Sequence, residues 1–231
     1  MQETFGKKPE LVAMFKKSLS QPRFGRYLSA SNNDEITAIE LYQWNARISQ
    51  SLYIYLQSWE ICLRNKINDF LVWKFKETWP YDQIRVLRNF KSDDKRRVAE
   101  TLMRQERDRG VKPVPTSVVV SDLSAGFWVS QLSSGYDIPH TWRYNLARVF
   151  PHNPKLSAKE AWTICDQLLT LRNRIAHHEP VFHLPLEERR EQLRQIVAAM
   201  CSATSMFSEA TCNFDKIWEL RPKPKEPATI A

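Results

Sequence analysis

The residues best suited to chemistry stand together in the segment 171–182, Leu-Arg-Asn-Arg-Ile-Ala-His-His-Glu-Pro-Val-Phe. Four residues separate Arg172 from His177, and Asn173 follows the arginine directly. A histidine has an unperturbed pKa of about 6.5, so it can accept or donate a proton close to neutral pH. An arginine stays charged and presents a planar fork of N–H donors that matches a phosphate. Together these side chains are suited to acid–base chemistry on a phosphate ester.

A helix is expected to position this segment. Ser157 and Glu160 fit a capping box, in which the serine hydroxyl and the glutamate carboxylate satisfy backbone N–H groups of the first turn. Pro180 should stop the helix, because the residue before a proline disfavours the α region. We therefore expect a helix that begins after Ser157 and runs to His177 or His178.

Arg172 is the unusual residue of this helix. On a wheel of about 100° per residue it falls within an apolar arc, opposite a narrow polar stripe. The arc holds Ala161, Ile164, Cys165, Leu168, Leu171, Ile175 and Ala176, and the stripe holds Asp166, Thr170, Asn173 and His177. An unpaired buried charge is very costly, so the guanidinium must find a carboxylate or extend to water.

Glu60 is the predicted carboxylate for Arg172. The alternative is a surface ion pair between Glu60 and Arg64, which are four residues apart on an expected helix. Arg64 and Asn65 are predicted to line the same pocket as Arg172.

The remaining helices are predicted from apolar periodicity and from helix-breaking residues. No Gly or Pro occurs from Glu35 to Trp79, which favours one or two long helices with a possible break at 45–49. In the first half of the chain we expect helices at 10–18, around Phe24 to Leu28, within 35–79, and at 92–110 with Ser92 as its cap. In the second half we expect helices at 121–132 and 186–207, and a short helix that follows residue 140 and ends at Phe150. Residues 111–120 are expected to be a loop or a short extended connection, and 133–140 a turn. Residues 1–221 are predicted to form one domain, followed by a disordered Pro-rich tail at 222–231.

The predicted helix 92–110 is dense in charge. Arg96, Arg97 and Arg104 are candidates for an RNA backbone track. The competing interpretation is a solvated helix face on which acidic residues neutralise the arginines at i,i+4 spacing.

Composition narrows the classes further. The formal charge of +8 favours a polyanionic partner, and only five glycines in 231 residues disfavour a β-sandwich or barrel. The four cysteines form no C-x-x-C pair and are expected to be core thiols in a reducing, cytoplasmic setting. The sequence predicts neither a signal peptide nor a membrane span.

Three motifs carry a resemblance to a known family. Arg172-x4-His177 resembles the R-x(4-6)-H motif of HEPN domains, and the whole run 171–182 is similar to the C-terminal signature of Abi-like (abortive infection) proteins of that superfamily. Upstream, the segment Trp59 to Asn65 resembles a second signature, and Gly126-Phe-Trp128 a third. The three occur in family order over roughly residues 10 to 215.

The resemblance implies an all-α, HEPN-like helical bundle with additional helices and a metal-independent endoribonuclease acting in antiphage defence or as a toxin. Arg172 and His177 would be the catalytic pair, with Asn173 as the third member and His178 in support. Arg174 would contact RNA. Such sites usually form across a homodimer. No cofactor or metal is implied, and the spacing of His178, Glu179 and His183 does not match an H-E-x-x-H zinc site.

Helix geometry gives an independent argument for a dimer. Residues at i and i+5 of a straight helix differ by about 140°, so one chain does not easily aim Arg172 and His177 at one phosphate, although a distorted helix end would also serve. Two alternatives to the ribonuclease remain open. One is an RNA-binding module that holds a structured regulatory RNA without cutting it, and the other is a protein-interaction bundle with a structural arginine.

Overall fold

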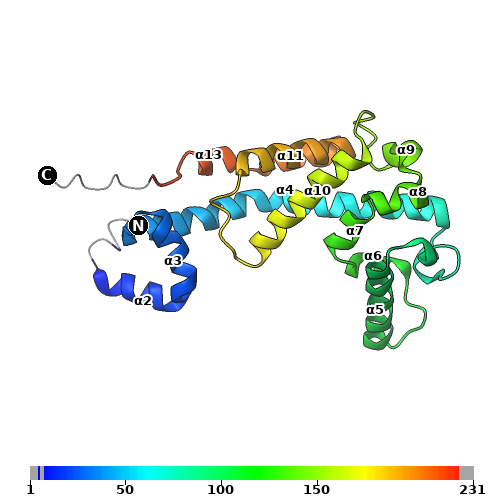
Figure 1. Cartoon of the computed structure of the whole chain (residues 1–231), viewed down its shortest axis with the longest axis horizontal. Helices are drawn as coiled ribbons and strands as arrows, with labels where there is room; N and C mark the ends of the chain where they lie inside the picture. Colours follow the sequence, from blue (N-terminus) through cyan, green and yellow to red (C-terminus); the bar gives the residue numbers. More distant parts are fainter. Residues whose placement is uncertain (1–4, 6–7, 224–231) are drawn as a thin grey trace. The chain divides into compact units, whose positions relative to one another are not determined.

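The computed structural model describes residue 5 and residues 8–223, and all regular secondary structure within that part is helical (Figure 1). The helices are α2 (Pro9–Leu19), α3 (Gln21–Ala30), α4 (Glu35–Phe75), η1 (Trp79–Tyr81), η2 (Leu87–Asn89), α5 (Ser92–Arg109), α6 (Thr116–Asp122), α7 (Ala125–Ser130), η3 (Ser134–Tyr136), α8 (Asp137–His140), α9 (Trp142–Asn145), η4 (Leu146–Arg148), α10 (Ala158–Ala176), α11 (Leu186–Met200), α12 (Ser202–Thr211) and α13 (Phe214–Trp218). The all-α prediction is confirmed. Of the predicted tail, residues 224–231 lie outside the described residues.

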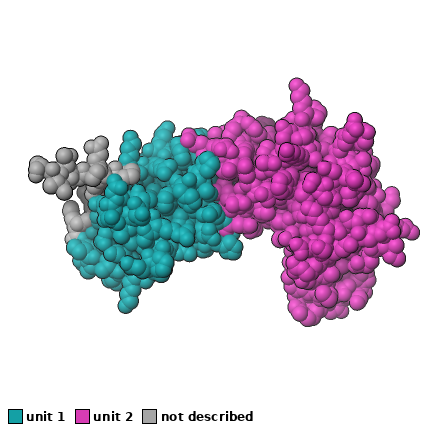
Figure 2. Space-filling view, viewed as in Figure 1, with its two compact units in different colours: residues 1–54, 174–186, 211–231 teal, residues 55–173, 187–210 magenta. Residues whose placement is uncertain are grey.

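The chain divides into two compact units (Figure 2). Unit 1 comprises residues 1–54, 174–186 and 211–231, and unit 2 comprises residues 55–173 and 187–210. Residues of α4 and of α10 belong to both units.

The helix α4 is a single helix of 41 residues, so the possible break at 45–49 is not present. At its start, the Asp34 carboxylate accepts the backbone N–H of Thr37 at 2.8 Å, which satisfies a donor of the first turn. The polar residues at the suspected break do not compete with the helix. Ser49 donates its hydroxyl to the carbonyl of Asn45 at 2.7 Å, and the Asn45 side chain bonds to a distant segment.

Aromatic side chains make up much of the core of unit 1. Tyr27 of α3 is fully buried, and its ring contacts those of Tyr42 and Phe182 at centroid distances of 5.0 and 5.1 Å. Trp44 of α4 is also buried and donates its indole N–H to the carbonyl of Ile217 at 2.8 Å. The helix α13 is thereby joined to α4.

Unit 2 has its own aromatic core. Trp59 is fully buried, and its indole nitrogen lies 3.5 Å from the sulfur of Cys165, which places α10 against α4 within this unit. Phe127 and Trp128 of α7 are buried, with ring centroids 4.8 Å apart. The motif segments around Trp59 and around Phe127 therefore both contribute large side chains to the same core.

The capping box of α10 is confirmed. The backbone N–H of Glu160 donates to the Ser157 hydroxyl at 3.2 Å, and the N–H of Ser157 donates to the Glu160 carboxylate at 2.9 Å. The hydrogen bonds lower the pKa of the Glu160 carboxyl. The helix ends at Ala176, one residue before the earlier of the two expected ends.

The prediction for 111–132 is wrong in its boundaries. The helix α6 begins at Thr116 inside the expected loop, because Val119 and Val120 are buried and their burial outweighs the weak helix propensity of valine. A single helix at 121–132 does not form. Leu123 adopts an extended conformation with ψ 132°, which separates α6 from α7.

Three other boundaries also differ. Ser92 is the first residue of α5 and not its cap, which is Lys91, although the helix ends as expected with Gly110 in the left-handed region. The expected turn 133–140 contains η3 and α8, and Thr141 at φ 55° separates α8 from α9, which ends at Asn145 and not at Phe150. The expected helix 186–207 is interrupted at Cys201. Near this point the N–H of His152 donates to the carbonyl of Ala199 at 3.1 Å, which engages an acceptor that a continuous helix would use.

His140 is a buried titratable group of unit 2. Its Nε2–H donates to Oε1 of Gln131 at 2.9 Å, and its ring stacks on that of Tyr136 at 4.7 Å. Burial, together with the charge of Lys74, lowers the pKa of His140 from 6.5 to about 3. His140 is therefore neutral in the folded protein at neutral and mildly acidic pH.

We expect His140 to make folding stability depend on pH. Between the folded pKa and the unfolded pKa the unfolded chain binds one more proton, so the free energy of unfolding falls as the pH drops. At pH 5 this loss amounts to about 2 kcal/mol. Urea unfolding at pH 7 and pH 5 should show that His140→Gln loses about 2 kcal/mol less than the wild type over this interval. The other four histidines are common to both proteins and serve as the internal control. An equal pH dependence in both proteins would show that His140 is not buried in neutral form.

Candidate functional site

The Arg172 guanidinium is held by a carboxylate within unit 2. Its Nε donates to Oε2 of Glu60 at 3.0 Å, and its Nη2 donates to Oε1 of the same residue at 3.4 Å. The Arg172 side chain is 38% exposed and that of Glu60 30%, so the pair lies at the boundary between core and solvent. The predicted partner of Arg172 is confirmed, and the two-point contact fixes the plane of the guanidinium.

Asn173 completes this cluster. Arg172 donates from Nη1 to the side-chain oxygen of Asn173 at 3.4 Å, and Asn173 is exposed to solvent. Arg64 donates from Nε to Oδ1 of its neighbour Asn65 at 3.1 Å. Within the described residues no hydrogen bond joins Arg64 or Asn65 to Arg172, and no ion pair joins Arg64 to Glu60. The surface pair between Glu60 and Arg64 is therefore not formed, since Glu60 is engaged by α10.

His177 and His178 lie in the turn that follows α10, and both are exposed. His178 adopts the left-handed conformation with φ 55°, and its N–H donates to the carbonyl of Ile175 at 3.0 Å. The N–H of Glu179 donates to the carbonyl of Arg174 at 2.8 Å. These bonds satisfy the last carbonyls of the helix and reverse the chain directly after His177.

Two residues that the sequence did not single out hold this turn in unit 1. Arg23 of α3 donates from Nη1 to the carbonyl of His178 at 2.5 Å. Asn45 of α4 accepts the backbone N–H groups of Val181 and Phe182 at 2.8 and 3.2 Å. The partners are more than 130 residues apart along the chain, so no local pattern could have revealed them.

Arg174 also contacts residues of the turn that follows α10. Its Nη1 lies 3.6 Å from the Glu179 carboxylate, 3.4 Å from the carbonyl of Pro180 and 3.5 Å from Nε2 of His183. Burial, followed by the charges of Arg174 and Arg26, lowers the pKa of His183. Arg174 was predicted to contact RNA, and the contacts it makes here are internal.

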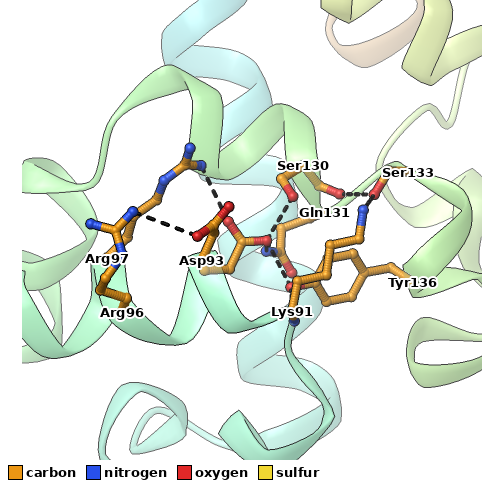
Figure 3. A network of polar contacts seen from close by, with 9 residues as sticks. Lys91, Asp93, Arg96, Arg97, Ser130, Gln131, Ser133 and Tyr136 are labelled. Atoms are coloured by element: carbon orange, nitrogen blue, oxygen red, sulfur yellow. Dashed lines mark hydrogen bonds and ion pairs between the residues drawn. The ribbon is translucent and has the colours of Figure 1, made fainter.

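The three arginines predicted as an RNA track on α5 are all paired with carboxylates. Arg96 reaches Asp93 at 3.6 Å and Glu100 at 3.1 Å, as Figure 3 shows in part. Arg104 reaches Asp122 at 2.6 Å. Arg97 reaches a buried carboxylate described next. This arrangement favours the interpretation of an ion-paired helix face over a track of free cations.

Asp94 is the buried carboxylate that Arg97 contacts, at 3.2 Å. It also accepts the hydroxyl groups of Ser130 at 2.6 Å and Tyr136 at 2.8 Å. Burial and the neighbouring Asp94 raise the pKa of Tyr136. Figure 3 shows Lys91 beside this network, where its ammonium donates to the Ser133 hydroxyl at 2.5 Å. The network joins α5 to α7 and η3 by satisfied contacts, which is a structural role.

The described residues contain neither a metal-binding cluster nor a membrane-spanning helix. No group of three or more His, Cys, Asp or Glu side chains within residues 5 and 8–223 is arranged to hold a metal ion. No helix in the same part is long and apolar enough to cross a membrane.

Comparisons of the chain with protein-family models, with curated proteins and with solved structures found no match. The family resemblance therefore depends on the sequence motifs and on what their residues do in this structure.

A double-mutant cycle tests the pairing at the site. Glu60→Ala and Arg172→Ala should each lower the free energy of unfolding, and their coupling energy should be about 1 kcal/mol, as expected for a two-point pair that is partly exposed. Urea unfolding at pH 7 gives the values. The matched control is the cycle of Glu60→Ala with Arg64→Ala, for which we expect a coupling near zero. Stronger coupling to Arg64 than to Arg172 would contradict the assignment.

Proposed function

We propose that this protein is a metal-independent endoribonuclease of the HEPN type, similar to Abi-like proteins, with Arg172, Asn173 and His177 as its catalytic residues. The observation that carries the proposal is the two-point Arg172–Glu60 pair, which presents an oriented guanidinium beside exposed Asn173. His177 lies five residues after Arg172 in the sequence and is exposed in the turn after α10. If Arg172 had only a structural role, it would not explain why Asn173 and His177 stand at the spacing of the HEPN motif.

The proposed reaction needs no metal, because RNA carries its own nucleophile. The 2′-oxygen attacks the adjacent phosphorus and loses its proton, while the bond to the 5′-oxygen breaks and that oxygen gains a proton. His177 would take the first proton or supply the second. Arg172 would stabilise the negative charge of the pentavalent phosphorus. The products are a 2′,3′-cyclic phosphate and a 5′-hydroxyl, and DNA is not a substrate.

A second copy of the chain is part of the proposal. In a two-fold dimer one protomer's Arg172 and its partner's catalytic histidine can act on one phosphate. In the cell, such an enzyme would act on RNA in growth arrest or antiphage defence.

A non-cleaving RNA-binding module is the second candidate, and one observation favours it. Glu60 neutralises Arg172 and would compete with a substrate phosphate for the same donors. An enzyme can accommodate this, because the two-point pair uses Nε and one Nη2 proton and leaves Nη1 directed toward Asn173. The two candidates differ in cleavage and not in binding.

RNA cleavage in the presence of EDTA tests the proposal. Wild-type protein should cut labelled total RNA to fragments with cyclic-phosphate ends, and His177→Ala or Arg172→Ala should lower the rate by about 100-fold or more. The matched control is His152→Ala, which removes another exposed histidine and should leave the rate unchanged. Equal rates for all variants would indicate a contaminating nuclease. RNA binding without cleavage under these conditions would support the binding module.

A further inference from the structure

Unit 1 contains an aromatic cavity beside the turn that carries His177. Its volume is about 430 Å³, and its walls come from α3, α4, the end of α10 and the turn after it. The walls include the side chains of Tyr27, Tyr42 and Tyr53, and also Gln50, Ile175 and His178. Ala176 and His178, the residues on either side of His177, both line it. Cavities of this size and composition commonly hold small planar ligands.

The hydroxyl of Tyr27 lacks a partner in this cavity. The Tyr27 side chain is 1% exposed, and among the described residues no hydrogen bond is made by its hydroxyl. Other buried aromatic residues differ: Tyr136 donates to Asp94, and Trp44 donates to Ile217. The hydroxyl oxygen is not fully buried, because Tyr27 lines the cavity, so the hydroxyl can donate to a group that binds there.

Tyr53 supplies an exposed aromatic face at the mouth. Tyr53 is 59% exposed, and Gln50 lies one helical turn before it on α4. Within the described residues the Gln50 amide makes no hydrogen bond, so it is free to donate and accept at a ligand edge. Ala46, a further turn back, leaves room for the ligand. A planar ring with polar edges, such as a nucleobase, fits this set of groups.

A second hollow of about 350 Å³ shares the Glu179 wall with the aromatic cavity. It is lined by Arg23 and Arg26 of α3. Arg26 is exposed, and no carboxylate among the described residues pairs with it. The charge of Glu179 is opposed by Arg174 at 3.6 Å. The hollow therefore has a positive character suited to a phosphate group.

We infer that these two hollows bind one nucleotide of a single RNA strand, with the base between Tyr53 and Tyr27 and the phosphate at Arg23 and Arg26. The strand then passes the turn at His177. The inference rests on the proposed function only for this last step, since the nucleotide site itself does not use Arg172, Asn173 or His177. A nucleotide in a strand and a free nucleotide share the same chemistry at such a site.

Fluorescence anisotropy of a short labelled single-stranded oligonucleotide with 2′-O-methyl sugars measures binding without cleavage. We expect Tyr53→Ala to weaken binding by about ten-fold through lost stacking. Tyr27→Phe should weaken it by about two- to ten-fold while leaving the urea midpoint unchanged, because the hydroxyl makes no hydrogen bond with the described residues. The control is Tyr144→Ala, another exposed tyrosine at 73%, which should bind as the wild type does.

The dependence of affinity on salt concentration tests the phosphate contact separately. Arg26→Ala should reduce the slope of log affinity against log salt concentration by about one. Displacement of the oligonucleotide by adenosine monophosphate at equal nucleotide concentration would overturn the strand assignment in favour of a free nucleotide.

Unchanged affinity in both Tyr53→Ala and Tyr27→Phe would overturn the inference, and so would a clear loss of stability in Tyr27→Phe. The result is separable from that of the cleavage assay. Tyr53-dependent binding without any cleavage keeps this site and removes the proposed enzyme. Cleavage that is unaffected by Tyr53→Ala, with unchanged binding, keeps the enzyme and removes this site.

Discussion

The packing of α10 against α4 within unit 2 is the constraint on which the candidate site depends. Trp59 and Glu60 are adjacent on α4, and they contact Cys165 and Arg172, which are seven residues apart on α10. The first contact is a buried aromatic ring against a core thiol, and the second is an ion pair at the edge of the core. Because seven residues return to nearly the same face of a helix, both contacts require one register of α10. A shift of that register would separate Arg172 from Glu60 and Cys165 from Trp59 together.

Charge in this protein is distributed differently from what the total suggests. The formal charge of +8 is compatible with an RNA ligand, yet Arg96, Arg97 and Arg104 of α5 are all paired with acidic neighbours. Arg97 forms an ion pair with the buried carboxylate of Asp94, so its charge contributes to folding. Two arginines of α3, Arg23 and Arg26, make no ion pair with a carboxylate of the described residues, and both line the hollow beside Glu179. Net charge thus indicates a class of partner, whereas the location of the contact depends on which cations the fold leaves unpaired.

Much of the fold could be predicted from the sequence where the controlling interactions are local. The absence of Gly and Pro from Glu35 onward predicts the long α4, and Ser157 with Glu160 predicts the start of α10. The requirement for a carboxylate at Arg172 was predictable from periodicity, and Glu60 was the suggested partner. The errors occur where a distant segment decides the outcome. The interruption at Cys201 coincides with a bond from His152, and the burial of Val119 and Val120 determines the start of α6. The anchoring of the turn by Arg23 and Asn45 belongs to the same class, because nothing in residues 171–182 specifies those partners.

The left-handed residue after His177 connects the fold of unit 1 to the proposed chemistry. A non-glycine residue in this conformation costs roughly 1 kcal/mol, and glycine would adopt it freely. His178 is nevertheless held there by its N–H bond to Ile175 and by the bond from Arg23 to its carbonyl. A glycine would keep both backbone bonds but would remove the side chain that lines the aromatic cavity. The chain therefore carries a conformational cost at the position where a side chain contributes to the cavity wall, and strain of this kind is most common at functional sites. If the cavity binds a nucleotide, the same turn that exposes His177 also shapes the surface that holds the neighbouring base, so positioning of the strand and presentation of the histidine follow from one backbone reversal.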